Sequence, residues 1–344
     1  MSGQRRRPTV KEVAVRAGVS PMTVSRTLAG GVNVTPELQQ RVLAAVAELG
    51  YHRDENARSI RPGQPSGLIG VAITNIANPY YSTFALGVEE EAARTGRRIL
   101  LGNTAEDPVR EAQLVGDFLG RRVEGLIVVP TGVSSDHLEH ARHSGVPVVL
   151  ASRRVAGLVA DSVVLDDEDG ALRGTSALLE AGHTRIAYLG NIRRIFTGER
   201  RYRGFVRAHR EHGIELDPRL VAEGQQEVEQ AARAMRALLE LDDPPTAVFC
   251  ANNRNTIGAV TEIGRQISSA GRRALDLPEL MSFDDFELSG LMPVPVSVIA
   301  HDPRELGRRA AALLLGRLED AGDAAPRELE LPVTLLRRTR RATD

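Results

Sequence analysis

From residue 68 onward, short apolar runs alternate with longer amphipathic stretches. The apolar runs are typical of buried strands: Leu68–Thr74, Arg98–Leu101, Gly125–Val129, Val146–Leu150, Arg185–Leu189, Thr246–Cys250, Leu280–Phe283 and Val296–Ile299. The amphipathic stretches, each of roughly three to four helical turns, predict helices: Tyr80–Arg94, Glu106–Gly120, Asp169–Glu180, Glu199–His212, Glu227–Leu241 and Asn253–Gln266. Strands buried on both faces that alternate with helices predict a doubly wound parallel α/β fold.

The length of this region, residues 67–344, predicts two α/β lobes rather than one. In open parallel sheets, ligands bind at the carboxyl ends of the strands. We therefore expect a small-molecule effector to bind in a cleft between the two lobes.

Residues 1–52 predict a separate three-helix head that contains a helix-turn-helix. Ser20 is the expected N-cap of the second helix, and Pro21 is its expected first residue. The third helix is predicted to begin with Thr35 as N-cap and to end near Gly50. Small apolar residues would let the first two helices cross closely: Val13, Ala14, Ala17, Val19, Val24 and Leu28.

The outer face of the second helix carries Thr23, Ser25 and Arg26. Hydroxyl and guanidinium groups suit phosphates and base edges, so double-stranded DNA is the leading candidate partner. Local capping is an equal alternative for the hydroxyls of Thr23 and Ser25.

Residues 53–66 join the head to the larger region. The part 54–61 is compatible with a short helix, but only Ala57 and Ile60 in it could be buried. A helix this short is marginal in water without packing. The stretch 62–67 is rich in Pro and Gly and predicts a linker.

Positive charge is concentrated at the amino-terminal end. Residues 1–61 hold 10 basic and 5 acidic residues, a net of +5, whereas the remainder has 34 − 40 = −6. A basic head on an acidic body favours nucleic acid as the partner of the head. A basic arm on an ordinary helical domain would leave the helix-start residues unexplained.

Several other classes of protein do not fit the sequence. No apolar run approaches the ~20 residues of a membrane helix, and no secretory signal is recognisable, so we expect a cytoplasmic protein without a membrane partner. The single cysteine, Cys250, is expected to be inert packing. His137, His140 and His143 are expected on a solvated helix face rather than around a metal. Phosphate-binding loops and nucleophile elbows are not recognisable, so we expect neither a cofactor nor catalysis.

The chain resembles the LacI/GalR family of bacterial transcription regulators over nearly its whole length. The motifs that carry this resemblance are Val10–Ala14, Gly18–Arg26, Leu49–Tyr51, Ala57–Ser59, Ile76–Tyr81, Gly182–Ala187 and Ser282–Asp285. The resemblance implies a homodimer, a near-palindromic DNA operator, and a periplasmic-binding-protein-like body that binds a small effector, usually a sugar or related metabolite.

The resemblance also implies how the head meets DNA. Arg26 is the candidate for direct readout, because a guanidinium can donate two hydrogen bonds to guanine. By family position, Pro21 and Met22 also face base edges. A hinge helix at 54–61 would insert an apolar side chain into the minor groove, and Ile60 stands where the family has leucine. The full set of DNA-binding candidates is Thr9, Ser20, Pro21, Met22, Thr23, Ser25, Arg26, Ala57 and Ile60.

Eight residues match family positions around the effector: Tyr80, Tyr81, Ser152, Arg201, Gln226, Asn252, Asn253 and Asp284. Ser152 and Asn253 stand where many members carry Asp, and Gln226 replaces a common aromatic. His301-Asp302 replaces the usual Gln-Pro. Because of these departures, a neutral polyol, a nucleoside, and a phosphorylated or acidic sugar all remain open as effectors.

These features together predict a sequence-specific DNA-binding transcriptional regulator, of the repressor type, whose operator affinity is controlled by a small effector. A sugar-binding protein without a transcriptional role is the alternative, but it would have no use for residues 9–49. An α/β enzyme would need a catalytic constellation. The sequence names neither the effector nor the direction of its effect.

Overall fold

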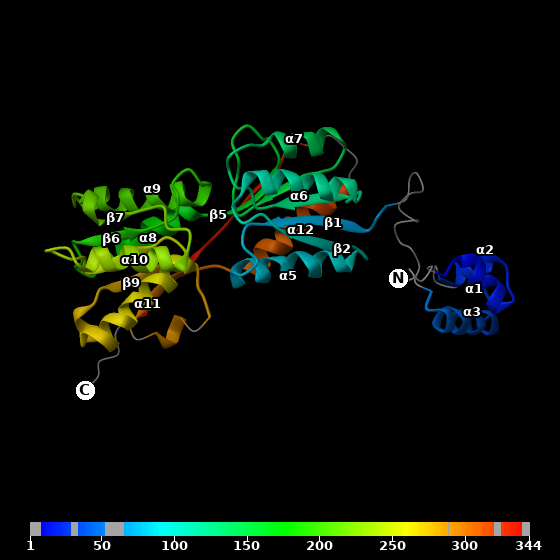
Figure 1. Cartoon of the computed structure of the whole chain (residues 1–344). Coiled ribbons are helices and arrows are strands. Elements are labelled where there is room, and N and C mark those ends of the chain that lie inside the picture. Colours follow the sequence, from blue (N-terminus) through cyan, green and yellow to red (C-terminus); the bar gives the residue numbers. More distant parts are fainter. Residues whose placement is uncertain are drawn as a thin grey trace. The chain divides into compact units, whose positions relative to one another are not determined.

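The chain forms two units, residues 1–66 and residues 67–344. The computed structural model describes residues 8–28, 34–51, 65–287, 289–292, 294–319 and 325–338. Figure 1 shows the helices of the first unit and the sheets and helices of the second. The predicted hinge, with Ala57 and Ile60, lies outside the described residues.

The first unit confirms the three-helix head, with α1 (Val10–Ala17), α2 (Pro21–Leu28) and α3 (Pro36–Leu49). Its core consists of small and medium apolar side chains: Val13, Ala14, Ala17, Val24, Val42, Ala45 and Tyr51. The turn after α1 uses Gly18 at φ 62°, a conformation that favours glycine.

The structure confirms the predicted starts of the second and third helices of the head. The hydroxyl of Ser20 accepts a hydrogen bond from the backbone N–H of Thr23 at 3.1 Å, as expected of an N-cap. Thr35 is the N-cap residue of α3, as predicted, although its side chain makes no capping hydrogen bond. Pro36 still starts α3, since its fixed φ suits a first helical position.

The second unit contains two lobes, each built on a six-stranded sheet. The sheet of lobe 1 has the order β2-β1-β3-β4-β5-β11, and its pairs are all parallel. Its elements are β1 (Leu68–Ile73), α5 (Pro79–Arg94), β2 (Arg98–Asn103), α6 (Pro108–Gly120), β3 (Gly125–Val128), α7 (Asp136–His143), β4 (Val148–Ala151), β5 (Asp161–Leu165), α12 (Pro303–Glu319) and β11 (Glu328–Leu331).

The sheet of lobe 2 has the order β7-β6-β8-β9-β10-β12. The pairs of this sheet are parallel, as predicted, except at the edge formed by β12, a strand that was not predicted and that pairs antiparallel with β10. The elements are α8 (Asp167–Glu180), β6 (Ile186–Leu189), α9 (Phe196–Glu211), β7 (Val221–Ala222), α10 (Val228–Leu239), β8 (Ala247–Cys250), α11 (Asn253–Ala270), β9 (Glu279–Phe283), β10 (Val296–Ala300) and β12 (Thr334–Leu336), with 3₁₀ turns at Pro218–Leu220, Ala274–Asp276 and Ser289–Leu291.

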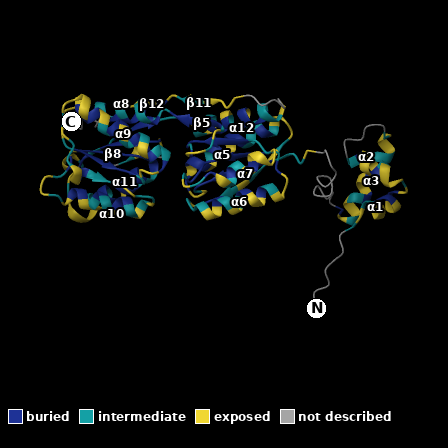
Figure 2. Ribbon diagram, turned by 90° about the horizontal axis from the view of Figure 1, so that it is seen from above, coloured by how far each residue is buried: buried dark blue, intermediate teal, exposed yellow. Residues whose placement is uncertain are grey.

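Helices cover both faces of each sheet, which explains the continuous apolar runs. In β1, Ile69, Val71 and Ile73 belong to the core beneath α5 and α12, whereas Ala72 belongs to the core beneath α6 and α7. Figure 2 shows the strands as buried layers between helices whose outer faces are exposed. The single cysteine, Cys250, is fully buried in β8, and burial raises the pKa of its thiol to about 12. Cys250 is therefore packing, as predicted.

Among the described residues, the chain passes between the lobes after β5, after β10 and after β11. Three of the elements at these crossings, β5, α12 and β11, were not predicted. The strand β5 begins with the polar residues Asp161 and Ser162, so its apolar run is short. The buried carboxylate of Asp161 accepts hydrogen bonds from Arg317 at 2.7 and 2.8 Å. The strand β11 is half exposed, so its hydrophobic signal is weak.

None of the described helices has both the length and the apolar character needed to span a bilayer.

Two glycines allow α5 and α12 to touch backbone to backbone. A Cβ atom on Gly87 would lie 2.0 Å from the carbonyl oxygen of Arg304, and one on Gly307 would lie 2.1 Å from that of Phe84. By contrast, a Cβ atom on Gly316, also in α12, would meet nothing within 4 Å.

This contrast predicts opposite effects of two identical substitutions in one helix. Gly307→Ala is expected to lower the free energy of unfolding by about 1–3 kcal/mol, because the methyl group forces the helices apart. Gly316→Ala is expected to raise it by up to about 1 kcal/mol through helix propensity. Chemical denaturation of the full chain, monitored by circular dichroism, measures the free energy of unfolding of both variants. Equal stability of Gly307→Ala and the wild type would contradict the close packing.

Candidate functional site

The head exposes one face of α2. Pro21, Met22, Ser25 and Arg26 are exposed, with 64% of Met22 accessible, whereas Val24 is fully buried against α1 and α3. The predicted readout residues therefore lie on an accessible surface of the helix. Their roles on DNA stay predictions.

Three of the candidate hydroxyl groups in the head are engaged in helix starts. Thr9 forms a capping box with Glu12: the Thr9 backbone N–H donates to Glu12 at 2.6 Å, and the Glu12 N–H donates to the Thr9 hydroxyl at 3.3 Å. The hydroxyls of Ser20 and Thr23 are 2.9 Å apart. Capping fixes the orientation of these side chains, and it leaves a phosphate role for them untested.

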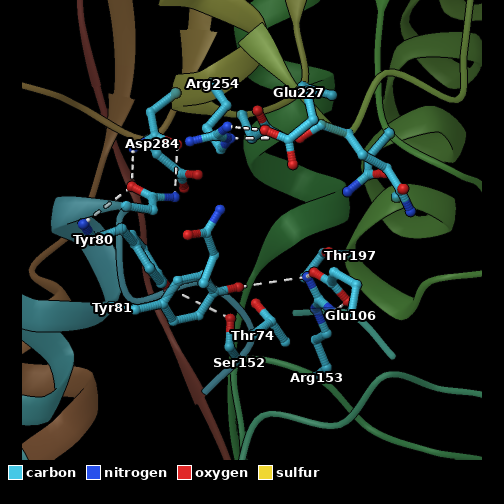
Figure 3. Close-up of a pocket in the computed structure, with 18 of the residues that line it drawn as sticks. Thr74, Tyr80, Tyr81, Glu106, Ser152, Arg153, Thr197, Glu227, Arg254 and Asp284 are labelled. Atoms are coloured by element: carbon cyan, nitrogen blue, oxygen red, sulfur yellow. Dashed lines mark hydrogen bonds and ion pairs between the residues drawn. The ribbon is translucent and has the colours of Figure 1, made fainter. Parts of the chain in front are cut away.

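The second unit holds a cavity of about 370 Å³ between its lobes, close to the carboxyl ends of the strands. The structure brings together in its lining all eight predicted effector residues: Tyr80, Tyr81, Ser152, Arg201, Gln226, Asn252, Asn253 and Asp284. Figure 3 shows several of these side chains around the cavity.

The lobe 1 wall is formed by the first turn of α5 and the segment after β4. The rings of Tyr80 and Tyr81 meet edge to face, with centroids 5.0 Å apart. The Tyr80 hydroxyl lies 3.4 Å from that of Ser152. Burial raises the pKa of both tyrosines, so both remain neutral phenols that can donate and accept hydrogen bonds.

The lobe 2 wall is organised by Arg201, which α9 places among acceptors. Its Nε donates to Asp167 at 2.7 Å, and its Nη1 donates to the carbonyl oxygen of Ala251 at 2.6 Å. Both Nη atoms lie 3.4 Å from the carboxylate of Asp284. Burial alone would lower the pKa of Arg201, but Asp284 and Asp167 outweigh it and raise the pKa. Burial also raises the pKa of Asp167 to about 6.

Arg201, one of the predicted effector residues, is thus itself held in place by the protein. The Nε and Nη1 atoms of Arg201 already donate hydrogen bonds to protein acceptors. An effector would therefore meet a guanidinium whose position is fixed and whose charge is already balanced by carboxylates.

A buried histidine at a lobe crossing links the two walls. His301 follows β10, and its side chain is only 3% exposed. Its Nε2 lies 3.4 Å from the Tyr80 hydroxyl, and its Nδ1 lies 3.8 Å from Asp284. Burial lowers the pKa of His301 to about 4, against a smaller opposing effect of Asp284. The imidazole is therefore neutral near pH 7.

Backbone strain is concentrated at the same cavity. Among the described non-glycine residues, five have φ between 54° and 70°, and four of these line the cavity: Ala105, Glu106, Ser152 and Asp284. Such conformations cost about 1–3 kcal/mol each and collect at binding and catalytic sites.

Sequence reasoning missed three polar pairs of the cavity. Asn78 and Asn253 exchange amide hydrogen bonds of 3.3 and 2.8 Å between the lobes. Arg153 binds both carboxylate oxygens of Glu106, at 2.8 Å each. Arg254 pairs with Glu227. Glu106 and Arg153 come shortly after β2 and β4, so the rule that ligands bind at carboxyl strand ends could have identified them.

The expectation for the histidines of α7 was wrong for His137. Its Nε2 lies 2.8 Å from the fully buried carboxylate of Glu111, and the side chain is 13% exposed. A second oxygen of Glu111 accepts from the backbone N–H of Thr131 at 2.7 Å. His137 thus helps to hold the loop after β3 and does not lie on a solvated face. The described residues contain no cluster of three side chains suited to a metal ion.

Two family models match the chain. The model described as "Bacterial regulatory proteins, lacI family" matches residues 9–54, and "Periplasmic binding proteins and sugar binding domain of LacI family" matches residues 66–339. Among curated proteins, the catabolite control protein A of Priestia megaterium is 30% identical over 310 residues, which cover 89% of this chain and 91% of that protein. The transcriptional repressor CytR of Escherichia coli is 30% identical over 314 residues and 90% of each chain.

Solved structures give the same result. The lac repressor dimer bound to operator and the anti-inducer ONPF superimposes with a TM-score of 0.81 at 25% identity, covering 97% of this chain and 98% of that one. A complex of the transcriptional regulator CelR with cellobiose gives 0.70 at 26% identity and covers 96% of this chain and 98% of that one.

The buried His301 predicts a specific pH dependence of stability. In the unfolded chain the His301 imidazole becomes protonated near pH 6.5, whereas in the folded state it stays neutral down to about pH 4. The free energy of unfolding therefore falls as the pH is lowered from 6.5 towards 4. Relative to His301→Gln, the wild type is expected to lose up to about 3 kcal/mol between pH 7 and pH 4.

Chemical denaturation of both proteins across this pH range tests the expectation. The comparison largely cancels the opposite effect of Asp167, whose raised pKa makes stability fall as the pH rises from 4 to 6. Parallel stability curves for the two proteins would contradict it.

Proposed function

Because the chain belongs to the LacI family of bacterial regulatory proteins, we propose that its head binds a near-palindromic operator while its cleft binds a small effector that controls operator affinity. In this proposal, residues 1–52 are the DNA-binding head, residues 53–66 are the hinge and linker, and residues 67–344 are the effector-binding and dimerisation domain. The boundary between the compact units, at Ser66 and Gly67, and the ends of the two family matches support these limits.

The chain is a DNA-binding transcriptional regulator of the repressor type that acts as a homodimer. The observation that carries this conclusion is that a single chain matches both the DNA-binding model and the sugar-binding-domain model of one family. A sugar-binding protein without a transcriptional role would share the second part alone.

On the head, we assign Arg26 to direct readout and the amino-terminal end of α2 to the phosphates and base edges around it. The exposure of Pro21, Met22, Ser25 and Arg26 supports this assignment, as does the burial of Val24 on the opposite side of the helix. Because bacterial DNA lies in the cytoplasm, we propose that the protein acts there.

In the cleft, we assign binding rather than catalysis. The named relatives are regulators and not enzymes. Aromatic edges, phenol and amide groups, and balanced charges are suited to a small polyhydroxylated molecule of the carbohydrate type. The volume of about 370 Å³ lies at the small end of ligand pockets, which span roughly 300–1,000 Å³.

Control of DNA binding then requires that the effector change the closure of the lobes. The Asn78–Asn253 pair is placed to respond, because it joins the start of α5 in lobe 1 to the start of α11 in lobe 2 beside the cavity. An effector that favours one degree of closure shifts the population of lobe arrangements by its differential affinity, and operator affinity changes by the same coupling.

The function itself is tested by selecting binding sites from random duplex DNA with the full chain. We expect enrichment of a palindrome. Arg26→Ala should weaken binding to it by roughly 10- to 100-fold, because a bidentate contact to guanine discriminates by about 1–3 kcal/mol.

Arg16→Ala is the matched control, since it removes the same charge from an exposed position of α1 where the arginine pairs with Glu48. It should retain the preference of the wild type. Absence of any palindrome preference in the wild type would overturn the proposed function, whereas full selectivity in Arg26→Ala would overturn only the role of Arg26.

The lobe-joining pair is tested by Asn253→Ala, which removes both amide hydrogen bonds. At about 1 kcal/mol for each bond, opening of the lobes should become roughly 30-fold more frequent. Hydrogen exchange at the first turns of α5 and α11 should accelerate accordingly.

Asn103→Ala serves as control, because Asn103 lines the same cavity but accepts a hydrogen bond within lobe 1 only, from the backbone N–H of Ile76 at 3.1 Å. It should leave exchange in α11 unchanged. Identical exchange in Asn253→Ala and the wild type would show that the pair does not hold the lobes together.

A further inference from the structure

The fixed charges that line the cavity are balanced. Three arginines and three carboxylates contribute, for a sum of 3 − 3 = 0: Arg153, Arg201 and Arg254 with Glu106, Glu227 and Asp284. Each arginine is paired with a carboxylate of the same lining. Asp167, which is fully buried behind Arg201, adds one more carboxyl group on the acidic side.

The pair of Arg153 and Glu106 belongs to lobe 1. Arg153 is 5% exposed and engages both oxygens of Glu106 at 2.8 Å, the bidentate geometry that gives the strongest ion pairs. The same guanidinium donates to the carbonyl oxygen of Pro130 at 3.3 Å and to the Tyr81 hydroxyl at 3.4 Å. The Glu106 side chain is 23% exposed, so its carboxylate still offers acceptor sites towards the cavity.

The other two arginines are balanced in different ways. Arg201 faces two carboxylates at once, at 2.7 Å and 3.4 Å. Arg254 pairs with Glu227 at a more exposed position, and its Nε lies 3.4 Å from the carbonyl oxygen of Gln226. Figure 3 shows the Arg254–Glu227 and Arg153–Glu106 pairs on opposite sides of the cavity.

An anionic ligand would have to compete with these carboxylates. Taking a guanidinium from its partner would leave a carboxylate unpaired in a partly buried site, which is strongly unfavourable. A ligand hydroxyl, in contrast, can donate to an exposed carboxylate oxygen and accept from a phenol or amide without breaking an ion pair.

We propose that the effector of this protein is an uncharged, polyhydroxylated molecule, and that Glu106 determines this selectivity by neutralising Arg153. The proposal rests on the effector role of the cleft given above. It selects the neutral class from the ligands that the sequence leaves open and adds Glu106 and Arg153 as specificity-determining residues.

Inorganic phosphate is the probe, titrated calorimetrically into the full chain at constant ionic strength. The wild type should show no saturable phosphate binding. Glu106→Gln removes the carboxylate charge with little change of shape and leaves Arg153 unneutralised. It should therefore gain saturable phosphate binding, at least about tenfold tighter than the weakest binding that the titration can detect. The double variant Glu106→Gln/Arg153→Gln should lose this gain. If Glu106→Gln does not fold, Glu227→Gln is the second variant. It leaves Arg254 without its carboxylate partner at a more exposed position of the cavity.

Glu124→Gln is the matched control. It makes the same charge change in lobe 1 at an ion pair outside the cavity, Arg97–Glu124 at 2.9 Å, where the carboxylate is 12% exposed. Equal phosphate binding by this control and Glu106→Gln would overturn the proposal, as would saturable binding by the wild type that Arg153→Gln abolishes. The titration measures cleft charge alone, so its failure is distinguishable from a failure to select an operator.

Discussion

Burial of parallel strands on both faces is the constraint on which the larger unit depends. It makes the middle of each strand apolar and moves polar side chains to the strand ends, where two sheets present them to one cavity. The same burial leaves ionisable groups at that cavity with little solvent, so they must either pair or become neutral. The Arg201 cluster, the bidentate Arg153–Glu106 pair and the neutral His301 are three results of this single requirement.

Sequence patterns predicted those parts of the fold whose signal is local. Buried strands and amphipathic helices were recognisable, and family motifs identified residues that meet in one cavity although they are far apart in the chain. The strands β5 and β11 at the lobe crossings were missed, because β5 begins with two polar residues, Asp161 and Ser162, and the edge strand β11 is half exposed. The partners Glu106, Arg153 and Asn78 were missed for another reason. Their roles arise from pairing in space, which periodicity does not encode.

Two kinds of contact differ greatly in strength in the effector unit. Its largest apolar cluster includes residues from both lobes, from Ile69 in β1 to Phe283 in β9, and thus resists large disruption. Beside the cavity, the hydrogen bonds that Asn78 and Asn253 exchange between the lobes are individually weak. A small molecule that binds there can therefore shift the populations of the open and closed arrangements of the lobes without unfolding either lobe.

The fully buried thiol in β8 has a practical consequence. Cys250 is the one cysteine of the chain, and its protonated, inaccessible sulfur would be spared by maleimide reagents in the native state. Two cysteines introduced on exposed surfaces, one per lobe, could then carry a fluorophore pair without removal of the natural residue. Single-molecule energy transfer would follow opening and closing directly in a protein whose interior is unaltered.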